Sequence, residues 1–164
     1  MPYTPILATL AYLVSPDRTH VLLIHRNTRA DDHAFGKYNG LGGKIERRED
    51  VGDSLRRELM EEAGVVATSV EFRGTVSWPG FGKNGEDWLS FVFLVTAWEG
   101  ELLNANHEGT LSWEPISRLV SGELPQWSGD KHFLPLVFDN DPRPFHGVMP
   151  YENGEPISWS VTRI

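Results

Sequence analysis

Three glutamates in one short segment have the spacing and the chemistry of a divalent-cation site. Glu58, Glu61 and Glu62 lie at positions i, i+3 and i+4, so in a helix their side chains project from one face. Like charges in this arrangement destabilise an isolated helix by about 0.2–0.5 kcal/mol per pair, and a cation such as Mg2+ or Mn2+ removes the repulsion. The alternative for these three residues alone is a solvated acidic face beside Arg56 and Arg57.

The element that must position these glutamates is predicted to be a helix over residues 51–63. Asp50 is a good N-cap, and apolar residues recur every four positions along the segment. Gly64 follows as a residue that can end the helix in the left-handed conformation. The stretch from Asn39 to Lys44 contains three glycines, so it must bend sharply or let its backbone approach another group closely.

Residues on both sides of the three glutamates complete a longer pattern. Gly43 is followed by five residues, Glu49, seven residues and then the run Arg57 to Val65, which reads Arg-Glu-Leu-Met-Glu-Glu-Ala-Gly-Val. This segment resembles the Nudix box, G-x5-E-x7-R-E-U-x-E-E-x-G-U with U an aliphatic residue, and matches every fixed position of it. The resemblance implies an α/β fold, namely a Nudix-type α/β/α sandwich with a mixed sheet, and hydrolysis of a diphosphate linked to another group.

The resemblance also implies a ligand set for the metal. Glu58 and Glu62 are the implied principal ligands, Glu61 lies close to the metals, and a main-chain carbonyl at Gly43 is available as a further ligand. Mg2+ is the implied cofactor, with Mn2+ able to substitute for it. Such an ion polarises the phosphoryl oxygens and lowers the pKa of the attacking water.

The remaining residues of the box support this ligand set. Glu49 is expected to pair with Arg57 across the junction of loop and helix. Such a pair fixes the direction of the metal carboxylates and places Arg57 in the catalytic set. Gly42 and Gly64 are the structural glycines, because Gly42 lets the loop backbone fold against the helix and Gly64 follows its last turn.

One candidate for the group that accepts the proton of the attacking water lies outside the box. Glu108 precedes a short predicted strand, Leu111–Glu114, and many Nudix enzymes place an extra glutamate facing the metals from this loop. It is therefore a candidate metal ligand and general base, and the alternative is an exposed loop glutamate. Glu58, Glu61 and Glu108 all remain candidates for the base.

Segments outside the box resemble one group of Nudix hydrolases, the eukaryotic-type 8-oxo-dGTP diphosphatases, also called oxidised purine nucleoside triphosphate hydrolases. Tyr38 to Lys44 is similar to the W-N-G-F-G-G-K stretch of that group, and segments 126–130 and 133–136 are similar to its W-P-D-D and W-F-P-L segments. The ending from Phe145 onward is similar as well. The implied reaction is hydrolysis of a nucleoside triphosphate, first of all an oxidised purine such as 8-oxo-dGTP, to a nucleoside monophosphate and pyrophosphate.

In that group an asparagine, a tryptophan and two adjacent aspartates bind the purine. Asn39, Trp127 and Asp130 match three of these residues, whereas Gly129 stands in place of the first aspartate. An amide can both donate and accept hydrogen bonds, as a purine edge requires, and an indole ring offers a stacking face. The alternatives are a turn residue for Asn39 and a core or rim aromatic for Trp127.

Three more residues are candidate substrate contacts. Trp78, at the end of its predicted strand, is placed to supply the opposite face of a base pocket. Arg26, at the end of an earlier strand, is a candidate phosphate contact, and its alternative is an arginine that faces solvent. Lys44 follows the glycines of the loop and is a further candidate for binding the substrate.

Other substrates remain open, because the box specifies the chemistry and not the substrate. Plain (d)GTP, dihydroneopterin triphosphate and ADP-ribose are the main alternatives. The contrasting class is a non-catalytic nucleotide-binding module that has kept the fold. Such modules usually lose one or more glutamates of the box, whereas this chain retains all of them.

The composition sets further limits. The chain has 164 residues, which predicts a single Nudix domain over 1–164, and no cysteine, which excludes disulfides, thiolate metal sites and cysteine nucleophiles. Its formal net charge of −8 argues against nucleic acid as a partner. No apolar run reaches the length of a membrane span. We therefore expect a cytoplasmic protein, monomeric or homodimeric, with a small nucleotide as its partner and no membrane association.

Periodicity and turn residues predict the other elements. Strands are expected at Ile6–Val14, Val21–His25, Val70–Trp78, Trp88–Trp98 and Leu111–Glu114, with the first two paired. Residues 27–38 and 79–87 are expected to be loops, residues 115–121 a short helix or turn, and residues 130–138 a second helix. Two β-like runs, 145–151 and 156–162, flank an Asn-Gly pair and predict a hairpin.

Overall fold

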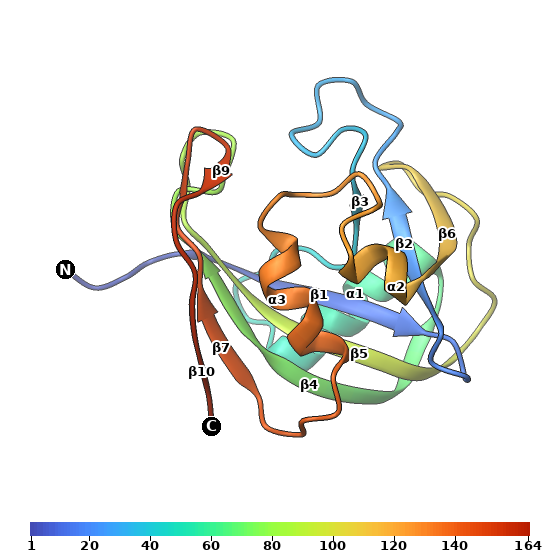
Figure 1. Cartoon of the computed structure of the whole chain (residues 1–164). Helices are drawn as coiled ribbons and strands as arrows, with labels where there is room; N and C mark the ends of the chain where they lie inside the picture. Colours follow the sequence, from blue (N-terminus) through green and yellow to red (C-terminus); the bar gives the residue numbers. More distant parts are fainter.

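An eight-stranded mixed sheet runs through the middle of the computed structural model, which describes residues 1–164 (Figure 1). Its strand order is β10-β7-β4-β5-β1-β2-β3, and β6 pairs with β2. The strands of this sheet are β1 (Ile6–Val14), β2 (His20–His25), β3 (Tyr38–Asn39), β4 (Val66–Trp78), β5 (Trp88–Glu99), β6 (Thr110–Pro115), β7 (Phe145–Val148) and β10 (Ser160–Arg163). A separate pair is formed by β8 (Tyr151–Glu152) and β9 (Glu155–Pro156).

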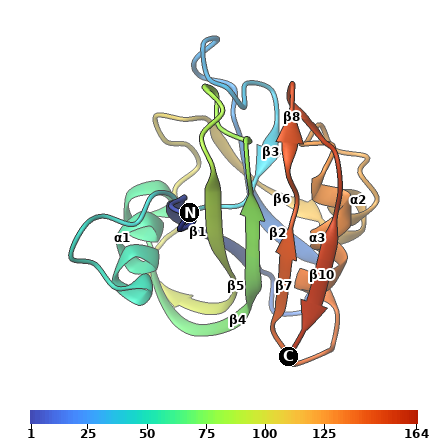
Figure 2. The same cartoon turned by 90° about the vertical axis from the view of Figure 1, so that its left-hand side faces the viewer.

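Helices cover both faces of the sheet, as Figures 1 and 2 show. They are α1 (Val51–Ala63), α2 (Ile116–Val120) and α3 (Asp130–Phe138). On one face Leu59 of α1 packs in a core that includes Val95 of β5. On the other face Phe133 of α3 packs in a second core with Val92 of the same strand. The α/β/α sandwich with a mixed sheet that the sequence predicts is therefore confirmed.

Strand β1 has β5 along one edge, whereas its other edge is shared between β2 and the glycine-rich loop. It runs parallel to β5 over most of its length but pairs with β2 only at its last two residues. The predicted pairing of the first two strands is thus present but short. Beside the rest of β1 lies segment 40–44, which bridges from Ala8 to Lys44 and from Ala11 to Leu41. The loop therefore lies along the edge of β1.

Helix α1 begins and ends where the sequence predicts. The carboxylate of Asp50 accepts a hydrogen bond from the backbone N–H of Asp53 at 2.8 Å. At the other end Gly64 has a φ of 75°, and its N–H donates to the carbonyls of Leu59 and Met60. A left-handed cap of this kind favours glycine because other residues pay a steric penalty there. Both ends of the helix are thus determined by local sequence.

Three regions differ from the prediction, and the first is β4, which begins at Val66 rather than at Val70. Tyr38 and Asn39 form the short strand β3 against the end of β2, at the boundary of what the sequence predicts as a loop. The C-terminal hairpin is also interrupted, because β7 pairs with β10 while β8 and β9 form their own short pair at the tip. Pro150 lies between β7 and β8 and has no N–H to donate, so across the hairpin its backbone only accepts a hydrogen bond, from the N–H of Ile157 at 2.9 Å.

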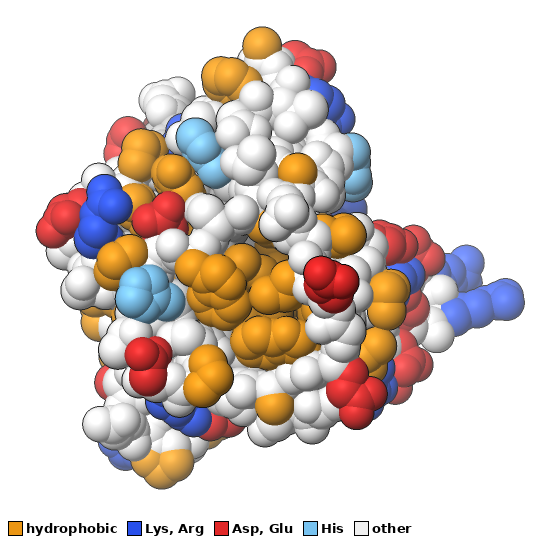
Figure 3. All heavy atoms as spheres, turned by 90° about the vertical axis from the view of Figure 1, so that its right-hand side faces the viewer, with side chains coloured by type: hydrophobic (Ala, Val, Ile, Leu, Met, Phe, Trp, Pro, Cys, Tyr) orange, Lys and Arg blue, Asp and Glu red, His pale blue; other side chains and the backbone are white.

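Apolar side chains gather in the middle of the face shown in Figure 3. Elsewhere on the sheet, Trp98 of β5 and Trp113 of β6 stack with their ring centroids 6.0 Å apart, and Trp113 remains exposed. Neither tryptophan lines the cleft described below.

None of the three helices has the length and apolar character that crossing a membrane requires.

Candidate active site

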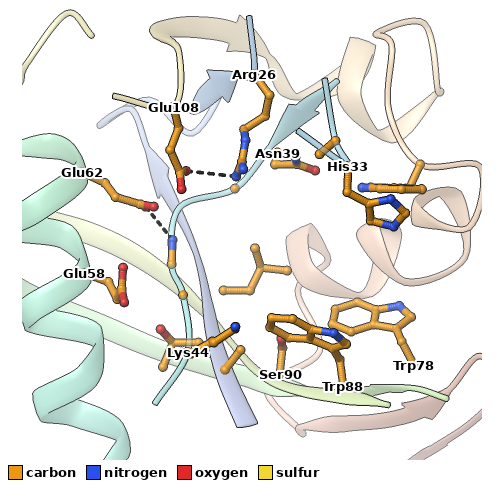
Figure 4. A pocket seen from close by; sticks show the side chains of 18 of the residues that line it. Arg26, His33, Asn39, Lys44, Glu58, Glu62, Trp78, Trp88, Ser90 and Glu108 are labelled. Atoms are coloured by element: carbon orange, nitrogen blue, oxygen red, sulfur yellow. Dashed lines mark hydrogen bonds and ion pairs between the residues drawn. The ribbon is translucent and has the colours of Figure 1, made fainter. Parts of the chain in front are cut away.

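One cleft of about 740 Å3 collects almost every residue that the sequence predicts for the site. Its walls include all of the candidate catalytic, metal-binding and substrate-binding residues, and of the structural residues only Glu49 and Gly64 lie outside it. Figure 4 shows the arrangement, with carboxylates from α1 and a nearby loop at one end and tryptophans at the other. The cleft therefore has an acidic end and an aromatic end.

The acidic end is built against the glycine-rich loop. The carboxylate of Glu62 accepts a hydrogen bond from the backbone N–H of Gly42 at 2.8 Å (Figure 4). The carboxylate of Glu58 lies directly against Gly43, where an added Cβ would come within 2.5 Å of its Oε1. Only glycine at position 43 allows this approach. The carbonyl of Gly43, the predicted additional ligand, already accepts a hydrogen bond from Thr9 N at 2.9 Å and retains a second lone pair.

The electrostatics of this end favour a cation. Burial, together with the charges of Glu108 and Glu58, raises the pKa of the Glu62 carboxyl to about 8. Burial also raises the pKa of Glu58, and the neighbouring carboxylates Glu61 and Glu108 add to this shift. These like charges face one another from different elements, and a divalent ion would favour their ionised forms. The donors are all oxygens, the ligands that suit Mg2+.

The carboxylates of the acidic end lie close to one another without converging on one point. No group of three acidic or histidine side chains lies close enough together to hold a metal ion. Each principal carboxylate instead has a protein partner, which is Gly42 for Glu62, Arg57 for Glu58 and Arg26 for Glu108. The residues present fit a hard divalent cation, because their donors are oxygens and each carboxylate keeps lone pairs beyond those that its protein partner occupies.

Arg57 organises the junction between the loop and α1. Its guanidinium donates to both carboxylate oxygens of Glu49, with Nη2 at 3.0 Å from Oε2, so the pair predicted from the sequence is present. The same group donates to Glu58 at 2.8 Å and to the carbonyl of Lys44 at 3.1 Å. The hydrogen bonds from Arg57 lower the pKa of Glu49 to about 2. Glu49 therefore stays ionised and keeps Arg57 in place.

Arg26 was predicted either to contact a phosphate or to face solvent. The structure contradicts the second alternative, because the side chain is largely buried in the wall of the cleft. Its Nη1 lies 2.9 Å from Glu108 Oε2, and its Nε donates to Asp32 Oδ2 at 2.7 Å. The charge of this arginine is thus already balanced by two carboxylates on the wall of the cleft. Glu108 also differs from an exposed loop glutamate, because its side chain is only 19% exposed and lines the same cleft.

The aromatic end is assembled from separate segments of the chain. Trp127 lies with its ring centroid 4.8 Å from that of Phe81 and 4.9 Å from that of His33. Trp78 is almost fully buried and packs edge-on against Phe133 at 5.8 Å. Figure 4 shows Trp78 and Trp88 side by side below His33 and Asn39. A planar ring that enters this end meets aromatic surface on several sides.

Two polar residues accompany these aromatic side chains. Asn39, on β3, presents an amide to the cleft, and Asp130 lies at the first turn of α3. Burial raises the pKa of the Asp130 carboxyl to about 7, although the charge of Lys37 opposes the shift. Near neutral pH this carboxyl is therefore partly protonated and can donate as well as accept a hydrogen bond. Lys37 also places its ammonium 4.4 Å from the centroid of Trp127.

Gly129 has no space for the aspartate that the resembling group carries at this position. An added Cβ would lie 2.3 Å from Met149 Sδ and 2.4 Å from the hydroxyl of Tyr151. Both of these side chains belong to the C-terminal segment and are buried. Asp130 is therefore the only carboxylate of the expected pair, and the volume of its missing neighbour is filled by protein.

Among the residues of the cleft that the sequence did not identify are three with aromatic rings, namely His33, Phe81 and Trp88. The position of Trp88 could have been predicted, because a hairpin closed by the loop 79–87 places Trp88 opposite Trp78. The structure shows this pairing. His33 and Phe81 lie in two loops with no periodic pattern, so no local signal identified them. Lys44 lines the cleft as predicted, with its ammonium 5.5 Å from the centroid of Trp88.

Comparisons with known proteins agree with this geometry. An oxidized purine nucleoside triphosphate hydrolase from Danio rerio is 26% identical over 155 residues, which are 94% of this chain and 92% of that protein. YvcI, an uncharacterised Nudix hydrolase from Bacillus subtilis, is 29% identical over 114 residues, which are 67% of this chain and 69% of that protein. The crystal structure of a MutT protein from Bacillus halodurans has a TM-score of 0.80 and 28% identity, and the match covers 95% of this chain and 97% of that one.

The family follows from a match over most of the chain. Residues 4–137 fit the model of the NUDIX domain, a range that includes the carboxylate helix, the glycine-rich loop and Glu108. The fold of the MutT relative supports the same conclusion. The chain therefore belongs to the NUDIX domain family and is a Nudix hydrolase.

Proposed function

We propose that this Nudix hydrolase cleaves purine nucleoside triphosphates, with an oxidised purine such as 8-oxo-dGTP as the preferred substrate, to a nucleoside monophosphate and pyrophosphate. The observation that carries the proposal is the division of one cleft into an acidic end and an aromatic end. A triphosphate fits the first and a flat base fits the second. The near full-length similarity to the Danio rerio hydrolase supports this choice of substrate.

The reaction needs an activated water and a neutralised diphosphate. Water attacks a phosphorus atom, the bond to the pyrophosphate oxygen breaks, and a carboxylate accepts the proton of the water. Mg2+ held by Glu58, Glu62 and Glu108 would supply the charge neutralisation and lower the pKa of the water. Glu58, Glu61 and Glu108 line the same end of the cleft and are the candidates for the base.

At the other end the chain binds and orients the base. Trp127 offers a stacking face, which is worth about 1–3 kcal/mol per base in proteins that bind single strands. Asn39 and Asp130 present hydrogen-bonding groups in which donors and acceptors are both available. Trp78 is almost fully buried, lines the same end of the cleft and presents a further aromatic surface to the base. These contacts hold the nucleotide so that its phosphates reach the carboxylates.

A panel of nucleotides tests the proposal. We expect 8-oxo-dGTP to have the highest kcat/KM with Mg2+, followed by dGTP, and the products to be the monophosphate and pyrophosphate. Preference for dihydroneopterin triphosphate or for ADP-ribose would overturn the substrate assignment. Tight binding of a nucleotide without any hydrolysis would instead indicate a non-catalytic binding module.

A further inference from the structure

Glu108 lies on a loop, and the structure shows how that loop is attached to the carboxylate helix. The side-chain amide of Asn106 donates through Nδ2 to the backbone carbonyl of Glu62 at 2.9 Å. Its Oδ1 accepts hydrogen bonds from the backbone N–H groups of Glu108 at 2.8 Å and Gly109 at 3.2 Å. One side chain thus connects the backbones of two predicted metal-site residues.

The loop has little freedom to move around this connection. At Gly109 an added Cβ would come within 1.8 Å of the backbone carbonyl of His25, so the loop lies directly on the end of β2. The backbone N–H of Asn106 also donates to the carbonyl of Gly109 at 2.9 Å, which closes the turn. The backbone position of Glu108 is therefore determined on both sides.

A second contact determines the direction of the Glu108 side chain. Arg26 pairs with Glu108 at 2.9 Å, as Figure 4 shows, and its other side pairs with Asp32 at 2.7 Å. Asp32 is itself held by the backbone N–H of Ala34 at 3.1 Å, and its side chain is only 7% exposed. The guanidinium is therefore anchored on one side by Asp32 and holds Glu108 on the other.

We infer that Asn106 and Arg26 are positioning residues that place the Glu108 carboxylate for hydrolysis, Asn106 through the backbone of the loop and Arg26 through the side chain. The inference rests on the proposed function and gives Arg26 a role other than direct contact with phosphate. Removal of a partner that orients a metal-binding or catalytic group typically lowers metal affinity or activity about 10–100-fold.

A double-mutant cycle tests the role of Arg26. With saturating Mg2+, we expect Arg26→Gln to lower kcat about 10–100-fold and to leave KM within about twofold, because the substrate is not contacted. In a Glu108→Gln background the same change should have almost no further effect, since its target is absent. Arg47→Gln, which removes an exposed positive charge, is the matched control. An equal loss in both backgrounds, or a rise in KM with kcat unchanged, would overturn the assignment.

Asn106 is tested without substrate. We expect Asn106→Ala to weaken Mn2+ binding to the nucleotide-free protein about 10–100-fold, as measured by electron paramagnetic resonance. Asn106→Asp keeps an acceptor for the N–H groups of the loop but replaces the donor to Glu62 by an oxygen that the carbonyl repels, so it should fold and still bind Mn2+ less tightly than the wild type. Asn104→Ala, an exposed residue of the same loop, should bind Mn2+ like the wild type.

The two experiments separate this inference from the proposed function. If the wild type hydrolyses none of the nucleotides, the proposed function fails, while the Mn2+ titration of the Asn106 variants still decides the positioning role. If Asn106→Ala and Asn106→Asp both fold and bind Mn2+ as tightly as the wild type, the positioning role of Asn106 is wrong even where hydrolysis is observed.

Discussion

The two ends of the cleft are built in different ways from the same fold. At the acidic end most side chains come from one helix and the loop before it, and each charged group has a hydrogen-bonded or ionic partner nearby. At the aromatic end the residues come from several segments that lie far apart in the sequence, and they contact one another mainly by packing. The difference indicates that the chemistry depends on short-range geometry, whereas the choice of base depends on how distant segments meet.

The largest effect is expected at the acidic end. Glu62→Gln keeps the size of the side chain and removes the charge that a divalent ion needs, so kcat should fall by several orders of magnitude. The fold should remain, because burial already disfavours the ionised form of this carboxyl. Circular dichroism and steady-state kinetics measure the two properties, and Glu101→Gln, on the surface, is the control.

A metal titration of the same variant adds a test that does not depend on substrate. The melting temperature of the wild type should rise with Mn2+, because at a concentration 100 times the Kd the ion adds about 2.7 kcal/mol to the free energy of unfolding. Glu62→Gln should lose most of this shift. Activity close to that of the wild type, together with an unchanged Mn2+ shift, would contradict the role of Glu62 as a ligand.

At the aromatic end the expected losses are smaller and concern the base. Trp127→Ala removes a stacking face, so kcat/KM should fall for every nucleotide alike, by roughly 5–150-fold for a loss of about 1–3 kcal/mol. Trp113→Ala, an exposed tryptophan outside the cleft, is the matched control. A loss confined to one base would show that Trp127 does more than stack.

Asn39→Ala should change the preference among bases rather than the overall rate. An unpaired hydrogen-bonding group on a bound base costs about 1–3 kcal/mol, so kcat/KM should fall most for the purines that hydrogen-bond to this amide. We expect the ratio of kcat/KM for 8-oxo-dGTP to that for dATP to change, while Mn2+ binding stays as in the wild type. The same loss for all nucleotides would place Asn39 away from the base edge.

Asp130 gives a prediction on pH. Its pKa in the folded protein is about 7, whereas an aspartate in an unfolded chain has a pKa near 3.9. Between these values the folded state binds more protons than the unfolded state, so the free energy of unfolding falls as the pH rises from about 4 to about 7. Asp130→Asn should remove this part of the slope, as measured by thermal unfolding at a series of pH values. An identical slope in both proteins would mean that Asp130 is ionised throughout.

Prediction from the sequence succeeded where the determinants are local. The helix that carries Glu58 and Glu62 follows from its own caps and apolar repeat, and the Glu49–Arg57 pair follows from a fixed spacing across one junction. The partners of Arg26 did not follow in the same way, because Glu108 lies far along the chain and reaches it only through the pairing of β2 with β6. His33 belongs to a loop whose course depends on tertiary contacts, so its packing against Trp127 has no signature in the sequence.

The smallest and most specific prediction concerns Gly129. On sequence alone, an aspartate here would restore the carboxylate pair of the resembling group and raise the preference for oxidised purines. The structure leads to the opposite expectation, because the new Cβ would overlap Met149 Sδ and the Tyr151 hydroxyl. Gly129→Asp should therefore lower stability by about 1–3 kcal/mol, the usual cost of overpacking, without raising that preference.

A combined variant, without the atoms that an aspartate at position 129 would overlap, tests whether lack of room or the chemistry of the carboxylate limits its effect. In Gly129→Asp combined with Met149→Ala and Tyr151→Phe, the aspartate gains room, and two neighbouring carboxyls can then share a proton and donate to the base. The ratio of kcat/KM for 8-oxo-dGTP to that for dGTP should rise in this combination and not in the single variant. Met149→Ala with Tyr151→Phe alone is the control for the loss of packing. A rise in the single variant would show that the two side chains move aside easily, and the filled volume at Gly129 would then play no part in the choice of base.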